Sequence, residues 1–502
     1  MKSISPTCRL ATAAAFVIVL FAPSVLYGAG FEVGEHTPRS TARGGTGAAN
    51  TTDPSAVYFN PALLSQAGDS QLLVSSNFLR LSAEFQREDF HPPFSDTPQN
   101  FDRVENQHGI FPIPFLTATF NLGPENLSLG AGVFSPSAYG NPCWGALEDG
   151  ECLPDRNGAT RGMAVETDMI VVYLGAGAAY RFQLGDERSL DVGLTAALAA
   201  QNTDFAVVAD ANLDRRPPWR EDPDNEVFVR GQDLRGFAPT AIFGLAYTDG
   251  PFRFGASFRP PIRWELSGTA DVEFSEFLQG LETSLTDDGM QLDTWHAGSL
   301  RLGWGVVGGQ HPADADRPRW DLEMNAVWEN WSLVDNFRLE LDGDVQTAAF
   351  QTSEGDNVTM SLYPVYQPKG YQDTLSLRTG FSYGVNSWLT AHTGGFLESA
   401  AQPLAYTSAD FVSWERYAAS VGASFQILDD LEFDVGYAFI YSPGRTVSNG
   451  RVYNPIPMSS CRGPDYDHEG CENPGTPPGN PQNEGQWNAH FQIFSAGLTW
   501  NY

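Results

Sequence analysis

Apolar and polar residues alternate with a period of two along most of this 502-residue chain. In residues 431–441, LEFDVGYAFIY, large apolar side chains hold every second position, and Glu, Asp, Gly and Ala fill the others. Successive side chains of a strand point to opposite faces, so the pattern predicts two-faced β-strands. A transmembrane helix needs about 20 apolar residues, whereas the longest later apolar run, Met169–Tyr180, is broken by Gly175 and Gly177. A membrane protein of this kind can only be a closed β-barrel.

Alternation alone does not separate such a barrel from a soluble sandwich, whose large residues face inward. Three features favour the barrel. The segments span about 10–15 residues, against about five or six in soluble strands. Aromatic residues gather at segment ends, as in interfacial girdles. The polar face is rich in Gly and Ala, which suits a lumen filled by another part of the chain.

About 14 segments share this pattern, an even number, as bacterial single-chain barrels have. The sequence therefore predicts an all-β fold, a 14-stranded antiparallel transmembrane barrel over residues 70–502. The expected strands lie near 70–85, 110–121, 126–134, 166–182, 189–205, 234–248, 251–268, 295–307, 318–341, 371–384, 387–397, 413–427, 430–442 and 488–502.

The links between segments are of two kinds. Asp249-Gly250 and Leu428–Asp430 are typical of tight periplasmic turns, whereas long stretches rich in Pro and Gly are typical of extracellular loops. These long stretches are 135–165, 206–233, 269–294, 342–370 and 443–487. Two cysteine pairs fall in them, Cys143 with Cys152 and Cys461 with Cys471. In an exported chain, this placement predicts two local disulfides. Zinc is disfavoured, because no CxxC spacing or nearby His pair is present.

Residues 1–28 are predicted to be a secretory signal peptide. Lys2 and Arg9 precede the apolar run Ala11–Ala22, and small residues follow. A membrane anchor is the weaker alternative, since the run is too short to span a bilayer. Residues 29–69 are small, Gly-rich and polar, and do not alternate. They are either a disordered exported terminus or a compact segment packed inside the barrel.

This N-terminal segment resembles the FadL family of outer-membrane transporters. The resemblance lies in Ala29-Gly30-Phe31, in Ala42-Arg43-Gly44 with Gly47-Ala48-Ala49, and in Asp53–Ala62, which ends in Asn60-Pro61-Ala62. Later motifs support it, namely residues 132–136 (GVFSP), Trp328-x-x-Trp331-Ser332 and residues 371–374 (YQDT).

The resemblance implies a function and a division of the chain. The family carries long-chain fatty acids and related hydrophobic compounds, toluene among them, across the Gram-negative outer membrane. It implies that residues 29–69 form a hatch inside the barrel. It also implies that Asn60, Pro61 and Ala62 belong to the hatch and that Phe31 lies near the ligand pocket. A role for Phe31 as a packing anchor is an equal alternative. Exit of the solute sideways through the wall is a further implication.

Charge limits the partners. A net charge of −32, or −34 once two basic residues leave with the signal peptide, excludes nucleic-acid binding. No G-x-S-x-G, P-loop, G-x-G-x-x-G or HExxH motif occurs, so we expect no enzyme, cofactor or metal site. Arg253, Arg259, Arg301 and Arg378 are predicted to face the lumen. They are candidates to hold a carboxylate, or else they pair with Asp321, Glu323, Glu432 and Asp434 on the same face, which is the favoured reading. Neutral hydrocarbons stay open as ligands.

The sequence thus predicts a passive, monomeric outer-membrane channel for hydrophobic small molecules, surrounded by membrane lipid and lipopolysaccharide, with the hatch as its gate. The alternative is a general-diffusion porin or a surface receptor or adhesin barrel. A TonB-driven receptor is excluded, because it needs about 22 strands and a larger plug.

Overall fold

The computed structural model describes residues 30, 32, 36–67, 70–90, 99–121, 126–140, 142–149, 151–153, 158–210, 224, 226–312, 317–351, 357–362, 364–454 and 481–502. The predicted signal peptide, Phe31, Cys461 and Cys471 lie outside these residues. No helix among the described residues is long and apolar enough to cross a membrane.

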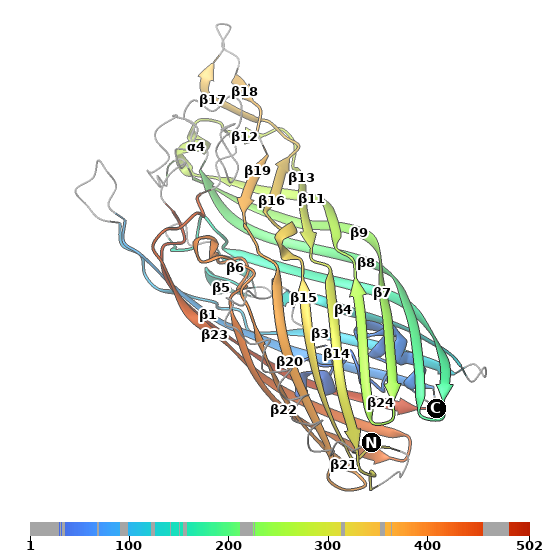
Figure 1. Cartoon of the computed structure of the whole chain (residues 1–502). Helices are drawn as coiled ribbons and strands as arrows, with labels where there is room; N and C mark the ends of the chain where they lie inside the picture. The colour runs from blue at the N-terminus through green and yellow to red at the C-terminus, as the bar shows by residue number, and fades with distance from the viewer. Residues whose placement is uncertain are drawn as a thin grey trace, which may run out of the picture.

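Fourteen antiparallel strands form a closed ring, as the sequence predicts (Figure 1). Pairing of the first strand with the last, from Gln71↔Asn501 to Arg87↔Gly485, completes it. Four positions of the ring consist of two strands in line, namely β10 with β11, β14 with β13, β15 with β16, and β20 with β19. In chain order the strands of the ring are β1 (Gln71–Arg87), β3 (Ile110–Asn121), β4 (Leu127–Gly140), β7 (Glu166–Gly185), β8 (Arg188–Asp210), β9 (Glu226–Asp249), β10 (Phe252–Arg259), β11 (Ile262–Phe274), β13 (Gly289–His296), β14 (Ser299–Gly308), β15 (Trp320–Glu329), β16 (Asn336–Leu341), β19 (Val365–Pro368), β20 (Thr374–Gly384), β21 (Leu389–Glu398), β22 (Arg416–Leu428), β23 (Leu431–Val447) and β24 (Gly485–Asn501).

The outer face is apolar and carries aromatic residues toward both ends of the strands, as expected for a surface in lipid. Near the short turns the exposed aromatic side chains include Tyr180, Phe182, Phe252, Phe254, Tyr383, Trp388, Trp500 and Tyr502. Toward the other end they include Phe237, Phe258, Trp328, Tyr417 and Tyr441.

The short turns and long connections lie at opposite ends of the barrel (Figure 1). Both predicted tight turns are present, between β9 and β10 and between β22 and β23. The long connections carry β2 (Val104–Glu105), β5 (Ala146–Glu148), β6 (Glu151–Leu153), α4 (Glu276–Gly280), β12 (Ser284–Leu285), β17 (Val345–Gln351), β18 (Asn357–Met360) and η4 (Leu404–Tyr406), whereas η3 (Trp331–Leu333) joins the in-line strands β15 and β16. The predicted Cys143–Cys152 disulfide is formed in this region.

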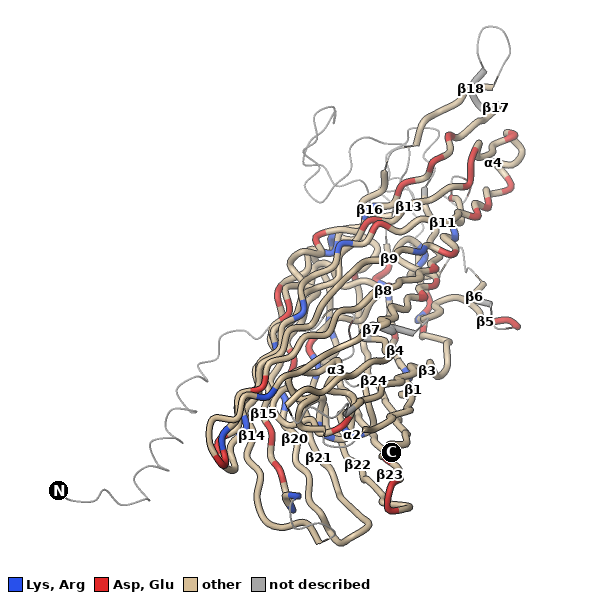
Figure 2. The backbone as a smooth tube through the Cα atoms, turned by 90° about the vertical axis from the view of Figure 1, so that its right-hand side faces the viewer, with Lys and Arg blue, Asp and Glu red and all other residues tan. Residues whose placement is uncertain are grey.

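Several strands run further into the long connections than the sequence predicts. β9 begins at Glu226 and β11 continues to Phe274, both within stretches expected to be loops. In β9 the alternation is lost because residues 226–229 are buried on both faces, although the hydrogen-bond ladder continues. Figure 2 shows acidic residues along β11, β13, β16 and α4 in this extension.

Residues 36–67 lie inside the ring. They form the short helices α2 (Pro38–Ala42) and α3 (Ala56–Phe59) and the 3-10 helix η1 (Pro61–Gln66). Helix α2 contacts β21 to β24 and β1, whereas η1 contacts β4, β7, β8 and β9 on the other side of the lumen. Both helices α2 and α3 are drawn within the wall in Figure 2. We call residues 36–67 the inner segment.

Glycines on the lumen face allow the inner segment to touch the wall backbone. A Cβ at Gly255 of β10 would overlap the Ala48 carbonyl, and one at Gly193 of β8 would overlap the Pro61–Ala62 peptide. The same close approach to the inner segment occurs at Gly244, Gly303, Gly380, Gly394, Gly422 and Gly436. The Gly-rich polar face seen in the sequence is therefore the surface against which the inner segment packs.

Hydroxyl groups of the wall then bind the inner segment's carbonyls. Ser257 donates to the Phe59 carbonyl at 2.7 Å, Thr195 to Val57 at 2.8 Å and Ser420 to Ala42 at 3.0 Å. These donors come from three separate strands, so the segment is held across the lumen rather than along one side.

We expect Gly255→Val to destabilise the folded barrel, because the new side chain has no space beside Ala48. Overpacking of this kind costs about 1–3 kcal/mol. Urea unfolding followed by gel mobility of unheated samples measures the change. Ala256→Val on the outward face of the same strand is the matched control and should leave the midpoint within error. Equal midpoints for both variants would contradict a tightly seated segment.

Candidate functional site

The Asn60-Pro61-Ala62 motif begins η1 and also attaches the inner segment to the barrel wall. Asn60 is the N-cap, with its Oδ1 accepting from the Ala62 amide at 3.2 Å, and Pro61 occupies the first helical position, where no N–H is needed. The Nδ2 group of Asn60 donates to the Ala48 carbonyl at 2.7 Å and to the Leu245 carbonyl of β9 at 3.0 Å. One buried side chain therefore caps a helix, joins two parts of the inner segment and binds the barrel.

Two arginines of the inner segment pair with the lumen carboxylates. Arg39 pairs with Glu432, and lies 3.6 Å from Asp434 and 3.5 Å from Asp53. Arg43 pairs with Asp321, and its Nη2 lies 3.3 Å from Glu323. The four carboxylates expected to pair with wall arginines thus pair with the inner segment instead.

Glu323 and Asn325 of β15 also receive main-chain donors. Glu323 Oε1 accepts from the amides of Gly47 at 3.1 Å and Ala49 at 2.8 Å. Asn325 Oδ1 accepts from the amides of Gly47 at 3.1 Å and Ala48 at 3.2 Å. Such bonds to a buried carboxylate are strong, and they fix the Gly47–Ala49 turn against the wall.

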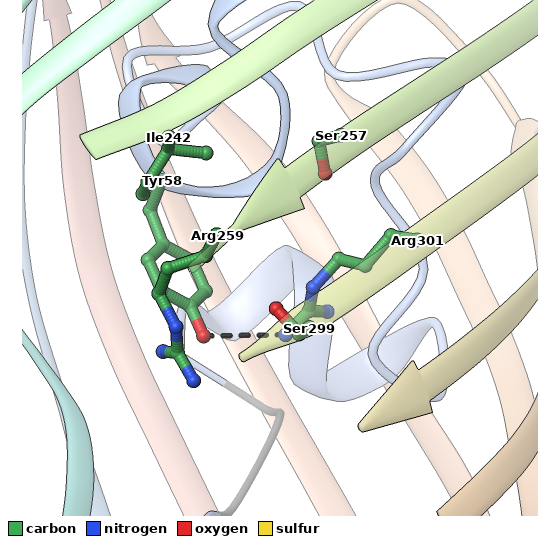
Figure 3. Close-up of a pocket in the computed structure, with 6 residues that line it drawn as sticks. All are labelled: Tyr58, Ile242, Ser257, Arg259, Ser299 and Arg301. Carbon is green, nitrogen blue, oxygen red and sulfur yellow. Dashed lines mark hydrogen bonds between the residues drawn. The ribbon is translucent and has the colours of Figure 1, made fainter. Parts of the chain in front are cut away.

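A small polar pocket lies between the inner segment and the wall (Figure 3). It has a cavity volume of about 10 Å³ and is lined by Tyr58, Ile242, Ser257, Arg259, Ser299 and Arg301. Arg301 donates to the Tyr58 hydroxyl at 3.2 Å, and its guanidinium lies 5.4 Å from the Tyr58 ring centroid. Two of the predicted lumen arginines, Arg259 and Arg301, therefore line one pocket together with Tyr58.

His36 completes the polar contacts of Tyr58, with its Nε2 lying 3.0 Å from the hydroxyl. Burial, together with the nearby positive charge of Arg301, lowers the pKa of His36 well below its usual value. His36 is therefore neutral at pH 7 and able to accept the Tyr58 proton in a hydrogen bond.

The residues just before the inner segment contact the same region. Glu32 pairs with Arg259 at 2.5 Å, and Arg416 Nη2 donates to the Gly30 carbonyl at 2.7 Å. Arg259 also donates to the Ala297 carbonyl at 3.0 Å, but its Nε and Nη1 have no hydrogen-bond partner among the described residues. An unpaired buried N–H is costly, so this arginine is suited to receive an acceptor from a ligand.

The other two predicted arginines lie elsewhere. Arg378 pairs with Glu398 at 2.7 Å, which is also 3.4 Å from Arg416. Arg253 lies near the short turns, where it donates to the Gly250 carbonyl at 2.6 Å. The four arginines thus do not form one site, and only Arg259 and Arg301 share the pocket.

The sequence analysis missed Glu32, Arg39, Arg43 and Tyr58. A signal was present for the arginines, because Arg39 and Arg43 are four residues apart in a segment with few charges. Strands β15 and β23 also each place two carboxylates on the lumen face, Asp321 with Glu323 and Glu432 with Asp434. Such pairs require nearby cations. No group of three or more potential metal ligands occurs in the part of the chain that is described.

The wall ladder is interrupted beside the pocket, between β3 and β4. These strands pair only over Phe115–Asn121, and residues 110–114 of β3 pair with β1 alone. Beyond Phe134, β4 follows β7 with two register shifts. Phe134 lies at this point, buried, with its ring centroid 5.5 Å from that of Tyr58. Pro112, Pro114 and Pro136 flank the interruption and lack the N–H that a ladder needs.

The long-loop end of the lumen is filled by aromatic side chains. Trp487 stacks on Phe85 at 3.8 Å and meets Trp414 and Trp144 edge-on at 6.1 and 6.2 Å. Trp144, next to the disulfide, donates to the Ala409 carbonyl at 2.9 Å. The loop that bears the disulfide is therefore joined to the loop between β21 and β22 above the lumen.

The chain matches the family model described as "Outer membrane protein transport protein (OMPP1/FadL/TodX)" over residues 19–458. It belongs to this family. Membership makes it an outer-membrane protein that transports hydrophobic compounds rather than an enzyme. No curated protein matches the chain.

Solved structures of FadL-type channels share the fold. A Pseudomonas aeruginosa FadL homologue has 16% identity and a TM-score of 0.69, with 94% of this chain and 100% of that chain covered. The P. putida toluene transporter TodX has 15% identity and a TM-score of 0.57, covering 95% and 99%. The Ralstonia pickettii toluene transporter TbuX has 13% identity and a TM-score of 0.55, covering 93% and 98%.

We expect Asn60→Ala to destabilise the inner segment, because the Ala48 and Leu245 carbonyls lose a buried donor, at about 1–3 kcal/mol each. Limited proteolysis and urea unfolding of the purified barrel measure the effect. Asn60→Asp keeps the helix cap but lacks the two donors, so it separates these roles. Exposed Asn488→Ala is the control, and a similar loss there would remove any special role for Asn60.

Proposed function

We propose that this protein is a passive channel in which residues 29–69 form a hatch inside a barrel of residues 70–502, and that small movements of this hatch open a path for hydrophobic solutes. We further propose that residues 1–28 direct export as a signal peptide and that the barrel acts as a monomer in membrane lipid and lipopolysaccharide. The observation that carries the proposal is the lumen itself, which the inner segment fills from β9 across to β23.

The moving part of the hatch is proposed to be its start rather than the inner segment. The inner segment is held by two arginines, by the Asn60 contacts and by wall glycines. Gly30 and Glu32, in contrast, are held through Arg416 and Arg259 beside the pocket. Displacement of these first residues is needed to enlarge the pocket, because its free volume of about 10 Å³ has room for only about one water molecule. Phe31 lies between these two contacts in sequence, which supports its proposed place next to the ligand.

The proposed substrates are long-chain fatty acids, and aromatic or aliphatic hydrocarbons are the alternative. The buried, half-satisfied Arg259 and the neighbouring Arg301 favour a carboxylate, which accepts hydrogen bonds from guanidinium groups in a bidentate manner. The apolar residues that surround the pocket, among them Phe59, Phe134 and Ile242, favour an attached hydrocarbon chain.

The proposed exit lies between β3 and β4, where the ladder is interrupted beside Phe134. A solute that leaves there passes directly from an apolar lining into lipid and avoids a polar lumen. Contact between Tyr58 and Phe134 couples this exit to the hatch.

Deletion of residues 29–36, or Phe31→Gly, should change the uptake of oleate or toluene while the barrel stays folded and heat-modifiable. The reason is that these residues, His36 included, make contacts next to the pocket, whereas residues 37–67 keep their own contacts with the wall. Radiolabelled solute uptake by cells that express each variant is the measurement. If a knockout takes up both compounds normally and the purified protein shows a large, steady conductance, the porin alternative holds instead.

Arg301→Met should reduce oleate uptake by about tenfold, the equivalent of one lost charge-assisted hydrogen bond, and leave toluene uptake unchanged. Methionine keeps most of the side-chain volume against Tyr58. Arg188→Met, at an exposed ion pair near the short turns, is the control for loss of positive charge. An equal loss of uptake for both solutes would indicate a packing role for Arg301 and favour uncharged substrates.

A further inference from the structure

The barrel wall has another long interruption, between β9 and the β10–β11 strand. β10 pairs with β9 as far as Phe258↔Phe243, and β11 resumes at Ser267↔Arg235. Between these points, residues 236–242 of β9 have no ladder partner on this side, although they remain paired with β8 on the other. Pro239, Pro260 and Pro261 lie in the interruption, so three of its residues cannot donate.

The interruption lies at the outer edge of the apolar belt. On one side of it the outward side chains are Phe243 and Phe258, and on the other they are Arg235 and Asp233. Phe237, 72% exposed, stands at the boundary. Unpaired main-chain groups are not tolerated against the hydrocarbon region, but they are where protein or water covers them. This height therefore corresponds to the interface of the outer leaflet, on the side of the long loops.

Side chains rather than hydrogen bonds fill the interruption from the lumen. Trp264, Leu266 and Ile262 of β11 are buried there, opposite Ala238 and Ile242 of β9. The Trp264 indole meets His296 edge-on at 5.7 Å, and its Nε1 makes no hydrogen bond within the described part of the chain. Two strands joined by a hydrogen-bond ladder separate only if they unfold. A side chain that makes no hydrogen bond can instead clear the gap by a change of rotamer.

The inner side of this filled interruption borders the polar pocket. Ile242 lines both, and Arg259 is the residue directly before Pro260. Arg259 is held by Glu32, so the start of the hatch is joined by an ion pair to the margin of the interruption. The side chains of Glu32 and Arg259 are both almost fully buried. Removal of one partner from a buried ion pair strongly destabilises the folded state.

We propose that the β9/β10–β11 interruption is a second lateral opening, through which an acidic amphipathic solute in the outer leaflet reaches the pocket. Trp264 closes it, and the Glu32–Arg259 pair keeps it closed while the hatch is in place. The acidic head meets Arg259 and the apolar chain follows along Ile242, Trp264 and Leu266. This role rests on the proposed transport function, but the opening itself is measurable without transport.

Lipid access tests the opening. Ile242→Cys and Ala238→Cys are labelled separately with NBD in proteoliposomes, and quenching by lipids brominated high on the acyl chain is compared with unbrominated lipids. Ala438→Cys is the matched control, because it is equally buried on the lumen face of β23 between unbroken ladders. We expect stronger quenching at positions 242 and 238 than at 438, and a further increase in the Trp264→Ala background.

The ion pair is tested in the same assay. Glu32→Gln keeps the contact from Arg416 to the Glu32 main chain but weakens the pair with Arg259. It should raise the open population at position 242 by about tenfold. A tenfold shift requires less free energy than the loss of one partner from a buried ion pair costs. Glu323→Gln, which breaks a hatch-to-wall pair at β15 away from the interruption, should not. Equal quenching at 242, 238 and 438 in every background would overturn the proposal.

Oleate flux into the same vesicles separates this proposal from the transport function. Trp264→Ala should increase the initial rate, whereas Trp304→Ala, on the lipid face of β14, should not. Normal flux with no lipid access at 242 and no effect of Trp264→Ala refutes the second opening and leaves the transport function intact. Lipid access at 242 without flux of oleate or toluene refutes the transport function instead.

Discussion

Main-chain hydrogen bonding is the constraint on which this structure depends. In a bilayer every peptide group needs a partner within the protein, and a closed ring of strands supplies one along almost the whole wall. Departures from full pairing are therefore informative. Two such departures lie beside Phe134 and beside Arg259, and prolines that cannot donate flank both. At these two places, prolines in the sequence coincide with the missing ladder hydrogen bonds.

The lumen follows from a second constraint, that a barrel of this size has space inside it to fill. Small residues on the polar face leave room for a segment that approaches the strand backbone, and its own carbonyls and arginines then satisfy the wall's hydroxyls and carboxylates. Buried carboxylates such as Glu323 would be costly alone. Glu323 is tolerated because Arg43 and two main-chain amides, those of Gly47 and Ala49, surround it.

Much of the fold was predictable from the sequence, because strand number and facing follow from alternation, which lipid on one side and a packed lumen on the other impose strictly. The site was less predictable. The Gly and Ala of the polar face indicated a filled lumen. The Asn60 motif indicated that the N-terminal segment fills it. That Asp321 and Glu432 pair with Arg43 and Arg39 could not be deduced, because pairing across the lumen depends on the rotation of the inner segment. The early start of β9 was hidden for a different reason, since residues 226–229 are buried on both faces and give no alternating signal.

Tyr58 connects these constraints. Its ring faces Phe134 at one interruption, and its hydroxyl binds Arg301 and His36 in the pocket next to the other. It is also two residues from Asn60, whose side chain fixes the local backbone to β9. A solute that enters the pocket must therefore displace contacts made by the Tyr58 side chain. Because Tyr58 lies next to both interruptions, its displacement changes the packing at each of them. In the proposed gating, a segment fastened at its middle and displaced at its start responds to a ligand without leaving the barrel, so the wall stays sealed to water while an apolar path opens.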